Sequence, residues 1–208
     1  MRTKTLLLTA VLGLASAATS MAQVYSANVV GYVNQSYPAG YSIINAPLKG
    51  TNNAVPFLFA SPPDFSIIYK FTGGLYEPAN AYMFGSWSDP AQVLDPGDGA
   101  FLYSPSAWTN TYVGEVLLGA QTNTLPVGFS LKGSKVPQAG GLEALLGLVP
   151  GDFDIVYKFN QGTQNYDPAN AYMFGSWANG DPAINVAEGF FYFNAQGAAN
   201  NWTRTFNP

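Results

Sequence analysis

The ten residues PANAYMFGSW occur twice in this chain, at Pro78–Trp87 and again at Pro168–Trp177. Ten consecutive identities within one chain are far beyond chance, so the chain contains an internal duplication. The segments around the two copies follow in the same order, which predicts two equivalent halves. The matching segments are Tyr37–Pro47 with Leu125–Pro137, Asp64–Phe71 with Asp152–Phe159, Pro96–Tyr103 with Val186–Phe193, and Trp108–Tyr112 with Trp202–Phe206.

The first residues have the composition of a secretory signal peptide. Arg2 and Lys4 supply a positive start, Leu6–Ala15 an apolar stretch, and Ser20–Ala22 a cleavage site with small outer residues. The apolar stretch is shorter than the roughly 20 residues that cross a bilayer, and no second such stretch follows. We therefore predict a signal peptide that ends with this site, with Ala18 as the alternative end. The mature chain is expected to be soluble and exported to the extracellular or periplasmic space, without membrane insertion.

The charge of the chain limits the kinds of partner it can bind. Cleavage would remove Arg2 and Lys4 but no acidic residue, so the formal net charge would change from −4 to −6. An acidic surface without a cluster of Lys or Arg argues against nucleic acid and anionic membranes as partners. Charged residues make up 10% of the chain, well below the roughly 25% of an ordinary domain. Aromatic residues, Gly, Pro and Asn replace them, which is typical of a turn-rich extracellular β-protein.

The chain contains neither cysteine nor histidine. The absence of histidine excludes Ser-His-Asp and Cys-His catalysis, zinc sites with histidine ligands and histidine-based pH switching. The absence of cysteine means that a packed core must stabilise an exported protein that could otherwise form disulfides. We predict no cofactor and no metal.

Alternation of side chains indicates β-strands in both halves. The segment IIYKF places Ile67, Tyr69 and Phe71 on one face of a strand and Ile68 and Lys70 on the other, and the second half repeats this pattern. Such segments recur at the spacing of 8–12 residues that is typical of sandwiches and barrels. The predicted fold class is therefore all-β, with two pseudo-symmetric repeats of about six strands each.

Each repeat also contains one segment that favours a short helical turn. These segments are Asn53–Ala60 in the first half and Leu142–Leu148 in the second half. The second consists of good helix formers, whereas Pro56 interrupts the first. A single short turn is expected in each repeat.

No linker separates the two halves. The segment Thr111–Gly119 runs from one half into the next without a Pro-, Ser- or charge-rich spacer. We predict one β-sandwich or barrel-like body, with residues 1–22 as the signal peptide, 23–115 as the first repeat and 116–208 as the second repeat packed against it. Two separate domains are the alternative.

If the halves are related by a pseudo-two-fold axis, the two ends of the chain should imitate this continuous central segment. Tyr25–Gly31 and Trp202–Phe206 are then expected to lie close together and to complete the fold.

The duplicated aromatic residues are the first candidates for a binding site. Aromatic rings beside Asn and Ser side chains suit a pyranose, which has an apolar face and a polar rim. We therefore name Tyr82, Trp87, Tyr172 and Trp177 as candidate ligand-binding residues. The favoured alternative is that these rings fill the core, because half of any aromatic strand faces inward. In either case the tyrosine of this strand is expected to be more exposed than Phe84.

The acidic residues permit two further interpretations. Asp95–Gly99 resembles a calcium loop in composition, but a turn with glycine at a positive φ explains it with fewer assumptions. The duplicated acids could in principle serve glycoside hydrolysis, but acid and base must differ in environment. These acids are Asp64, Asp98, Asp152 and Glu188.

Lys70 and Lys158 are the only cations that occupy matching positions in the two halves. They lie among apolar neighbours. Each is expected to pair with an acid or to extend its ammonium group to the rim of the sheet.

Several segments resemble those of a family of exported, uncharacterised bacterial proteins built from this repeat. They are YSANVVGYVN, PAGYSIINAPL, IIYKF, PGDGAFLY and TNTYVGEV, and the resemblance covers nearly all of the mature chain. It implies export and a duplicated β-rich body, and it transfers no functional residue.

These observations favour a secreted, non-enzymatic β-protein with a structural, cell-surface or ligand-binding role. An extracellular glycan or a surface matrix is the expected partner. A carboxylate-dependent extracellular polysaccharide hydrolase is the alternative function, and it requires two neighbouring acids in a cleft.

Overall fold

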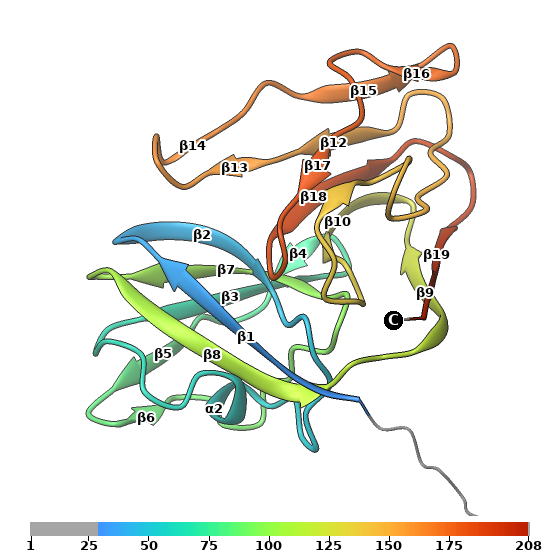
Figure 1. The fold of residues 1–208 in the computed structure, drawn as a ribbon. Helices are drawn as coiled ribbons and strands as arrows, with labels where there is room; N and C mark the ends of the chain where they lie inside the picture. The colour runs from blue at the N-terminus through green and yellow to red at the C-terminus, as the bar shows by residue number, and fades with distance from the viewer. Residues whose placement is uncertain (1–28, 208) are drawn as a thin grey trace, which may run out of the picture.

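The computed structural model describes residues 29–207, which form an all-β protein with one short helix (Figure 1). The predicted signal peptide lies outside the described residues. Within the described part of the chain, no helix is long and apolar enough to cross a membrane. The elements of the first half are β1 (Val30–Tyr37), β2 (Gly40–Asn45), α2 (Val55–Leu58), β3 (Ile67–Thr72), β4 (Leu75–Tyr76), β5 (Asn80–Met83), β6 (Ser86–Trp87), β7 (Gly99–Ser104) and β8 (Trp108–Glu115). Those of the second half are β9 (Gly119–Leu125), β10 (Gly128–Gly133), β11 (Gly140–Gly141), β12 (Ile155–Tyr157), β13 (Phe159–Asn160), β14 (Asn165–Tyr166), β15 (Asn170–Met173), β16 (Ser176–Trp177), β17 (Ala183–Ile184), β18 (Gly189–Asn194) and β19 (Asn200–Phe206).

Corresponding strands pair in the same order in the two halves. One sheet has the order β2-β7-β3-β5-β6 and the other the order β10-β18-β12-β15-β16. A two-stranded antiparallel ribbon accompanies each sheet, β1 with β8 and β9 with β19. Each half contains six strands of three or more residues within the described range, in agreement with the expected number.

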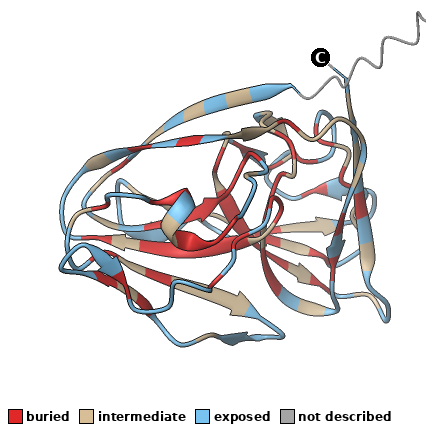
Figure 2. Cartoon of the chain, turned by 90° about the horizontal axis from the view of Figure 1, so that it is seen from below, coloured by how far each residue is buried: buried red, intermediate tan, exposed pale blue. Residues whose placement is uncertain are grey.

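Each half has its own apolar core. Figure 2 colours the buried residues red. The first core contains Ile44, Ile68 and Leu102, and the second contains Val156, Phe190 and Tyr192. Side chains on the other face of the same strands point away from these cores, among them Tyr69 and Phe71, which pack against a third cluster. The predicted alternation along β3 is therefore confirmed.

The third cluster joins the halves. It consists of Ile43, Phe101, Leu131 and Phe191, two residues from each half. Backbone bridges flank it and link Ile44 to Glu188 and Asp98 to Lys132. The amide of Asn45 donates to the carbonyl of Ala187 at 2.9 Å, and that of Gly133 to the carbonyl of Gly97 at 3.1 Å. We call this contact between the halves the seam.

The terminal strands lie against the central segment rather than against each other. Val30 pairs with Glu115 in β8, and Phe206 pairs with Gly119 in β9. Each terminal strand thus completes the ribbon of its own half. Figures 1 and 2 place the start of β1 and the end of β19 on the same side of the molecule. The part of the expected contact that involves Tyr25–Asn28 lies outside the described residues.

The short helical turn forms in only one of the two expected places. In the first half, Pro56 lies within the first turn of α2, where its missing amide hydrogen has no helical partner to lose. In the second half, the equivalent segment forms hydrogen-bonded turns. The carboxylate of Asp181 accepts bonds from the amides of Glu143 and Ala144 at 3.0 and 2.9 Å, and Gly147 has a φ of +76°. The left-handed Gly147 thus ends the segment before a regular helix forms, despite its helix propensity.

Two buried tyrosines make the stability of the protein sensitive to alkaline pH. The hydroxyls of Tyr37 and Tyr112 are hydrogen-bonded at 2.7 Å inside the first core, and burial raises the pKa of both phenols. The tyrosines ionise near pH 10 in the unfolded chain but at a higher pH in the folded protein. The stabilisation that comes from keeping these two phenols protonated is therefore complete below about pH 10, and it is lost as the pH rises through their folded-state pKa.

We expect the urea midpoint to be constant from about pH 7 to about pH 9 and to fall above about pH 10. Each tyrosine that ionises only after unfolding lowers the free energy of unfolding by about 1.4 kcal/mol per pH unit. The variant Tyr37→Phe should show a shallower decline. An unchanged midpoint at high pH would contradict this prediction.

Candidate functional site

The four aromatic residues named from the sequence do not form an exposed stacking surface. Tyr82, Trp87 and Trp177 are buried, and Tyr172 packs partly buried against the second core. Each tyrosine pairs across a hairpin with the tryptophan of its own copy, and the indole N–H of Trp87 donates to the carbonyl of Phe59 at 3.0 Å. The structure places these rings in or against the two cores, which is the alternative that was favoured.

The exposed ring of this hairpin is Phe84, not the tyrosine, which corrects a second expectation. Phe84 and Phe174 are 88% and 89% exposed, and their φ angles are 52° and 54°. Each precedes a glycine that also has a positive φ, Gly85 at 83° and Gly175 at 81°. Two successive left-handed residues form the tight turn that suits a two-residue hairpin. The turn thus directs Tyr82 inward and leaves Phe84 at the tip.

Aromatic side chains, most of them partly exposed, gather instead at the seam. The faces of β2, β3 and β7 that point away from the first core carry Tyr41, Tyr69, Phe71, Phe101 and Tyr103. The faces of β10, β12, β13 and β18 in the second half carry the equivalent rings, which are Phe129, Tyr157, Phe159, Phe191 and Phe193. The innermost rings bury one another, and the outer ones line two open clefts.

The first cleft, which we call cleft A, has a volume of about 660 Å³. Tyr41 and Tyr76 are 41% and 51% exposed at its rim. Phe159 enters it from the second half and meets Phe101 edge-to-face at 5.5 Å between ring centroids. The lining residues are Tyr41, Tyr69, Tyr76, Glu77, Ala79, Phe101 and Phe159.

The second cleft, cleft B, has a volume of about 460 Å³ and is built from equivalent positions. Phe71 from the first half enters it and meets Phe191 edge-to-face at 5.2 Å. Cleft A thus receives Phe159 from the second half, and cleft B receives Phe71 and Tyr76 from the first half, so neither would be complete in a single repeat. The lining residues are Phe71, Tyr76, Phe129, Tyr157, Tyr166 and Phe191.

Tyr76 and Tyr166 occupy matching positions where the two clefts meet. Tyr76 lines both clefts. Burial raises the pKa of Tyr76, and burial together with the neighbouring Tyr76 raises the pKa of Tyr166 to about 12. Both phenols are therefore protonated at neutral pH and can donate a hydrogen bond to a ligand.

One wall of cleft A is held by a side chain that has no equivalent in the first half. Gln164, in the turn between β13 and β14, accepts from the backbone amide of Tyr41 at 2.6 Å and donates to its carbonyl at 3.0 Å. The corresponding turn of the first half is two residues shorter and contains Gly73 and Gly74. Gly40 leaves room for this contact, because a Cβ there would lie 2.4 Å from the Gln164 Oε1 atom. The second half thus fixes the edge strand that carries Tyr41.

A polar cleft adjoins cleft A, and Phe159 lines both. It has a volume of about 660 Å³ and lies between β1 and the second half. Lys158 forms an ion pair with Glu188 at 3.1 Å and donates to the carbonyl of Ala183. The lining residues are Val33, Asn34, Gln35, Tyr37, Ala139, Lys158, Phe159, Asn160, Gln161, Gly162, Asp167, Asn185, Val186, Ala187 and Glu188.

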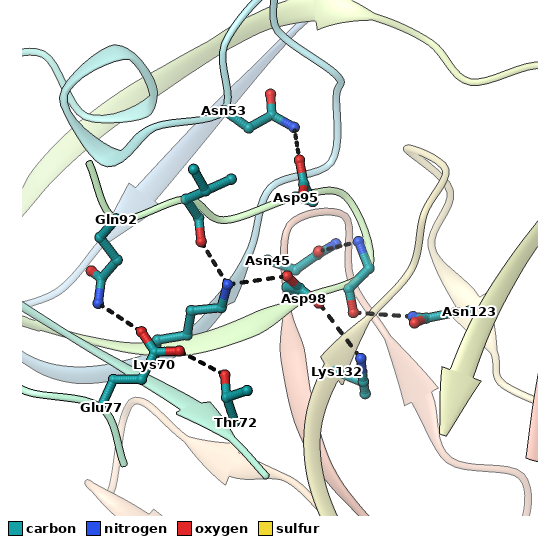
Figure 3. Close-up of polar contacts among 12 residues, drawn as sticks. Asn45, Asn53, Lys70, Thr72, Glu77, Gln92, Asp95, Asp98, Asn123 and Lys132 are labelled. Carbon is teal, nitrogen blue, oxygen red and sulfur yellow. Dashed lines mark hydrogen bonds and ion pairs between the residues drawn. The ribbon is translucent and has the colours of Figure 1, made fainter. Parts of the chain in front are cut away.

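The duplicated lysines pair with acids, as expected. Lys70 lies 3.3 Å from Asp98, the equivalent of Glu188, and donates to the carbonyl of Val93 at 2.7 Å. Asp98 also lies 3.5 Å from Lys132 of the other half (Figure 3). Asp98 and Glu188 therefore form ion pairs with lysines of the same chain.

Asp95–Gly99 forms a turn. The amide of Asp98 donates to the carbonyl of Asp95 at 2.9 Å, and Gly97 has a φ of +96°. The turn interpretation is confirmed. Within residues 29–207, no group of three or more acidic residues could hold a metal ion.

The four duplicated acids do not meet in one cleft. Asp64 and Asp152 are exposed, and Asp98 binds two lysines. Only Glu188 lines the polar cleft, where the second carboxylate is Asp167. Glu188 also accepts bonds from the backbone and the side chain of Asn185 at 2.9 and 2.8 Å. One carboxylate oxygen of Glu188 is therefore paired with Lys158, and the other already accepts hydrogen bonds from Asn185.

Reasoning from the sequence missed the rings that line the clefts. The alternation in IIYKF placed Tyr69 and Phe71 on one face, but nothing local showed whether that face is covered. The candidate site is thus the pair of aromatic clefts at the seam together with the polar cleft.

No protein-family model, no curated protein and no solved structure matches this chain.

Proposed function

We propose that this protein is an exported, non-enzymatic binding module that holds an extracellular glycan in cleft A. The observation that carries the proposal is the open cleft between the halves, with the partly exposed rings of Tyr41 and Tyr76 at its rim and a polar cleft beside it. A pyranose presents an apolar face that stacks on aromatic rings and a rim of hydroxyls that bond to amides and carboxylates. The two clefts supply these two environments side by side.

The distribution of charge supports a sugar rather than a phosphate-bearing ligand. Lys70, Lys132 and Lys158 are bound to carboxylates within the fold. None of them belongs to a basic patch of the kind that binds nucleic acid or anionic lipid.

The contacts of the acids favour binding over hydrolysis. A hydrolase needs one carboxyl group that can give a proton and another that can assist on the opposite side of the scissile bond. Of the two acids in the polar cleft, Glu188 is bound to Lys158 and Asn185. The alternative of a polysaccharide hydrolase therefore has less support.

The proposal predicts that removal of a rim ring weakens glycan binding. We expect Tyr76→Ala and Tyr41→Ala each to lower the affinity about tenfold, because a stacking ring contributes roughly 1 kcal/mol beyond its buried area. The measurement is affinity electrophoresis against immobilised β-glucan, xylan and mannan, followed by calorimetry on the glycan that binds.

Tyr32→Ala is the matched control, because Tyr32 is an exposed tyrosine on β1 that lines neither aromatic cleft. Equal losses for Tyr32→Ala and Tyr76→Ala, or no binding to any glycan on an array, would overturn the proposal. New reducing ends after incubation with the bound glycan would instead identify the hydrolase.

A further inference from the structure

We propose that the polar cleft continues cleft A, so that the two together bind a neutral glycan chain of several sugar units, whereas cleft B binds a single unit. This inference rests on the proposed function and specifies its ligand. Phe159 forms part of both walls, so a chain that stacks in cleft A can pass over this ring into the polar cleft. Each of the two volumes, about 660 Å³, lies within the range of about 300–1,000 Å³ that ligand pockets occupy.

The polar cleft is lined by groups that suit sugar hydroxyls. Its walls carry the amides of Asn34, Gln35 and Asn160 and the carboxylate of Asp167. Asp167 accepts a bond from Asn160 at 3.3 Å, and a carboxylate can accept several more. Amides both donate and accept, as hydroxyl-rich ligands require.

The equivalent place beside cleft B is largely filled. The cavity there measures about 200 Å³ and shares Phe71 and Phe129 with cleft B, as the polar cleft shares Phe159 with cleft A. Lys132 reaches across the seam to Asp98. Asn123 donates to the carbonyls of Gly97 and Gly133, both at 3.0 Å. Figure 3 shows Lys132, Asp98 and Asn123 with these contacts.

Two substitutions between the repeats explain why only one side is open. The position of Lys132 is occupied by Ile44 in the first half, and Ile44 is fully buried in the first core. No side chain therefore crosses from that position to Glu188. The position of Asn123 is occupied by Gln35, whose amide donates to the neighbouring carbonyl of Ser36 at 3.1 Å instead of across the seam.

The charges of the polar cleft specify a neutral chain. Asp167 and Glu188 are its carboxylates and Lys158 is its cation, so the formal charge of the lining is −1. The ammonium of Lys158 is already bound to Glu188 and to the carbonyl of Ala183. A uronate or sulfate group would enter without a free cation and beside a carboxylate, which is unfavourable. Oligosaccharides of neutral sugars are therefore the inferred ligands.

The test compares neutral oligosaccharides from the monosaccharide to the hexasaccharide of the glycan that binds, by calorimetry with the full mature chain. We expect the affinity of the tightest site to rise about tenfold or more with chain length. An Ala139→Trp substitution, at the exposed rim of the polar cleft, should abolish this rise and leave the affinity for the monosaccharide unchanged. Ala120→Trp is the matched control, because Ala120 is exposed on β9 and lines none of these clefts.

A second variant keeps the test independent of any effect of the added tryptophan. Asp167→Asn should raise the affinity for an oligosaccharide that carries one uronate at least threefold relative to the affinity for the neutral one. Affinities that do not depend on chain length, or that fall equally for Ala139→Trp and Ala120→Trp, would overturn the inference while cleft A still binds sugar. Binding of no neutral glycan of any length would overturn both the inference and the proposed function.

Discussion

Replacement of Asp154 by alanine is expected to lower the free energy of unfolding by about 3–5 kcal/mol. Asp154 is fully buried, and its carboxylate accepts hydrogen bonds from the backbone amides of Gly151 and Ala195 at 2.7 and 2.8 Å and from the hydroxyl of Tyr192. Burial, together with the carboxylate of Asp154, raises the pKa of Tyr192, so this hydroxyl is a donor at neutral pH. Alanine would remove the acceptor of these three donors, of which the Tyr192 hydroxyl is buried and the two amides are part-buried, and an unsatisfied buried donor costs about 1–3 kcal/mol.

The first half supplies the control for this prediction. Ser66 occupies the equivalent position and is fully buried, but its hydroxyl has no hydrogen-bond partner within the described residues. Ser66→Ala should therefore change the stability by about 0.5 kcal/mol or less. Urea unfolding followed by tryptophan fluorescence measures both variants. A loss of under about 1 kcal/mol for Asp154→Ala would contradict the role assigned to this carboxylate.

Replacement of Gly189 by alanine is expected to destabilise the seam by about 2–3 kcal/mol. A Cβ at this position would lie 2.7 Å from the carbonyl oxygen of Ile44 and 2.8 Å from the Ile43 Cγ2 atom, both in the opposite half. Gly99, its equivalent, would place a Cβ 2.9 Å from the backbone of Leu131 and Lys132. Backbone atoms cannot move aside as a flexible side chain can, so the halves would have to separate.

Gly197→Ala separates this steric effect from the general effect of replacing glycine. A Cβ at Gly197 would have no neighbouring atom within 4 Å, and the φ of this residue is not in the left-handed region. We expect this variant to be neutral or slightly stabilising. The double variant Gly99→Ala with Gly189→Ala should also weaken glycan binding, because each cleft includes at least one ring from the opposite half. Equal stability of Gly189→Ala and Gly197→Ala would show that the halves do not depend on this close approach.

Features that depend on local pattern could be predicted from the sequence. Alternation placed Ile68 and Lys70 on one face and Tyr69 and Phe71 on the other, as the structure shows. The matched lysines were expected to bind acids, and both do. Backbone geometry and charge pairing between neighbouring segments set these features, so short stretches of sequence contain the necessary information.

The candidate site could not be predicted in the same way. The identity of the two decapeptides drew attention to Tyr82 and Trp87, but identity alone does not distinguish a core contact from a ligand contact. The glycine after Phe84 was the one local signal for a two-residue turn, and recognition of that turn would have placed the phenylalanine at the tip. No local sequence signal identifies Tyr41 and Tyr76 as cleft residues, because their exposure depends on how far the second half covers the face of the sheet that carries them.

The sequence by itself determined the duplication, the all-β class, the alternation of the strands and the exclusion of histidine and cysteine chemistry. The tertiary structure decided which aromatic face became a core, which became a cleft, and which side of the seam stayed open. The reason is physical. A strand of alternating side chains has two apolar faces here, and only the packing of the second half against the first decides how much of the outer face is covered. Lys132 and Asn123 close one side, and Ile44 and Gln35 at the equivalent positions leave the other open.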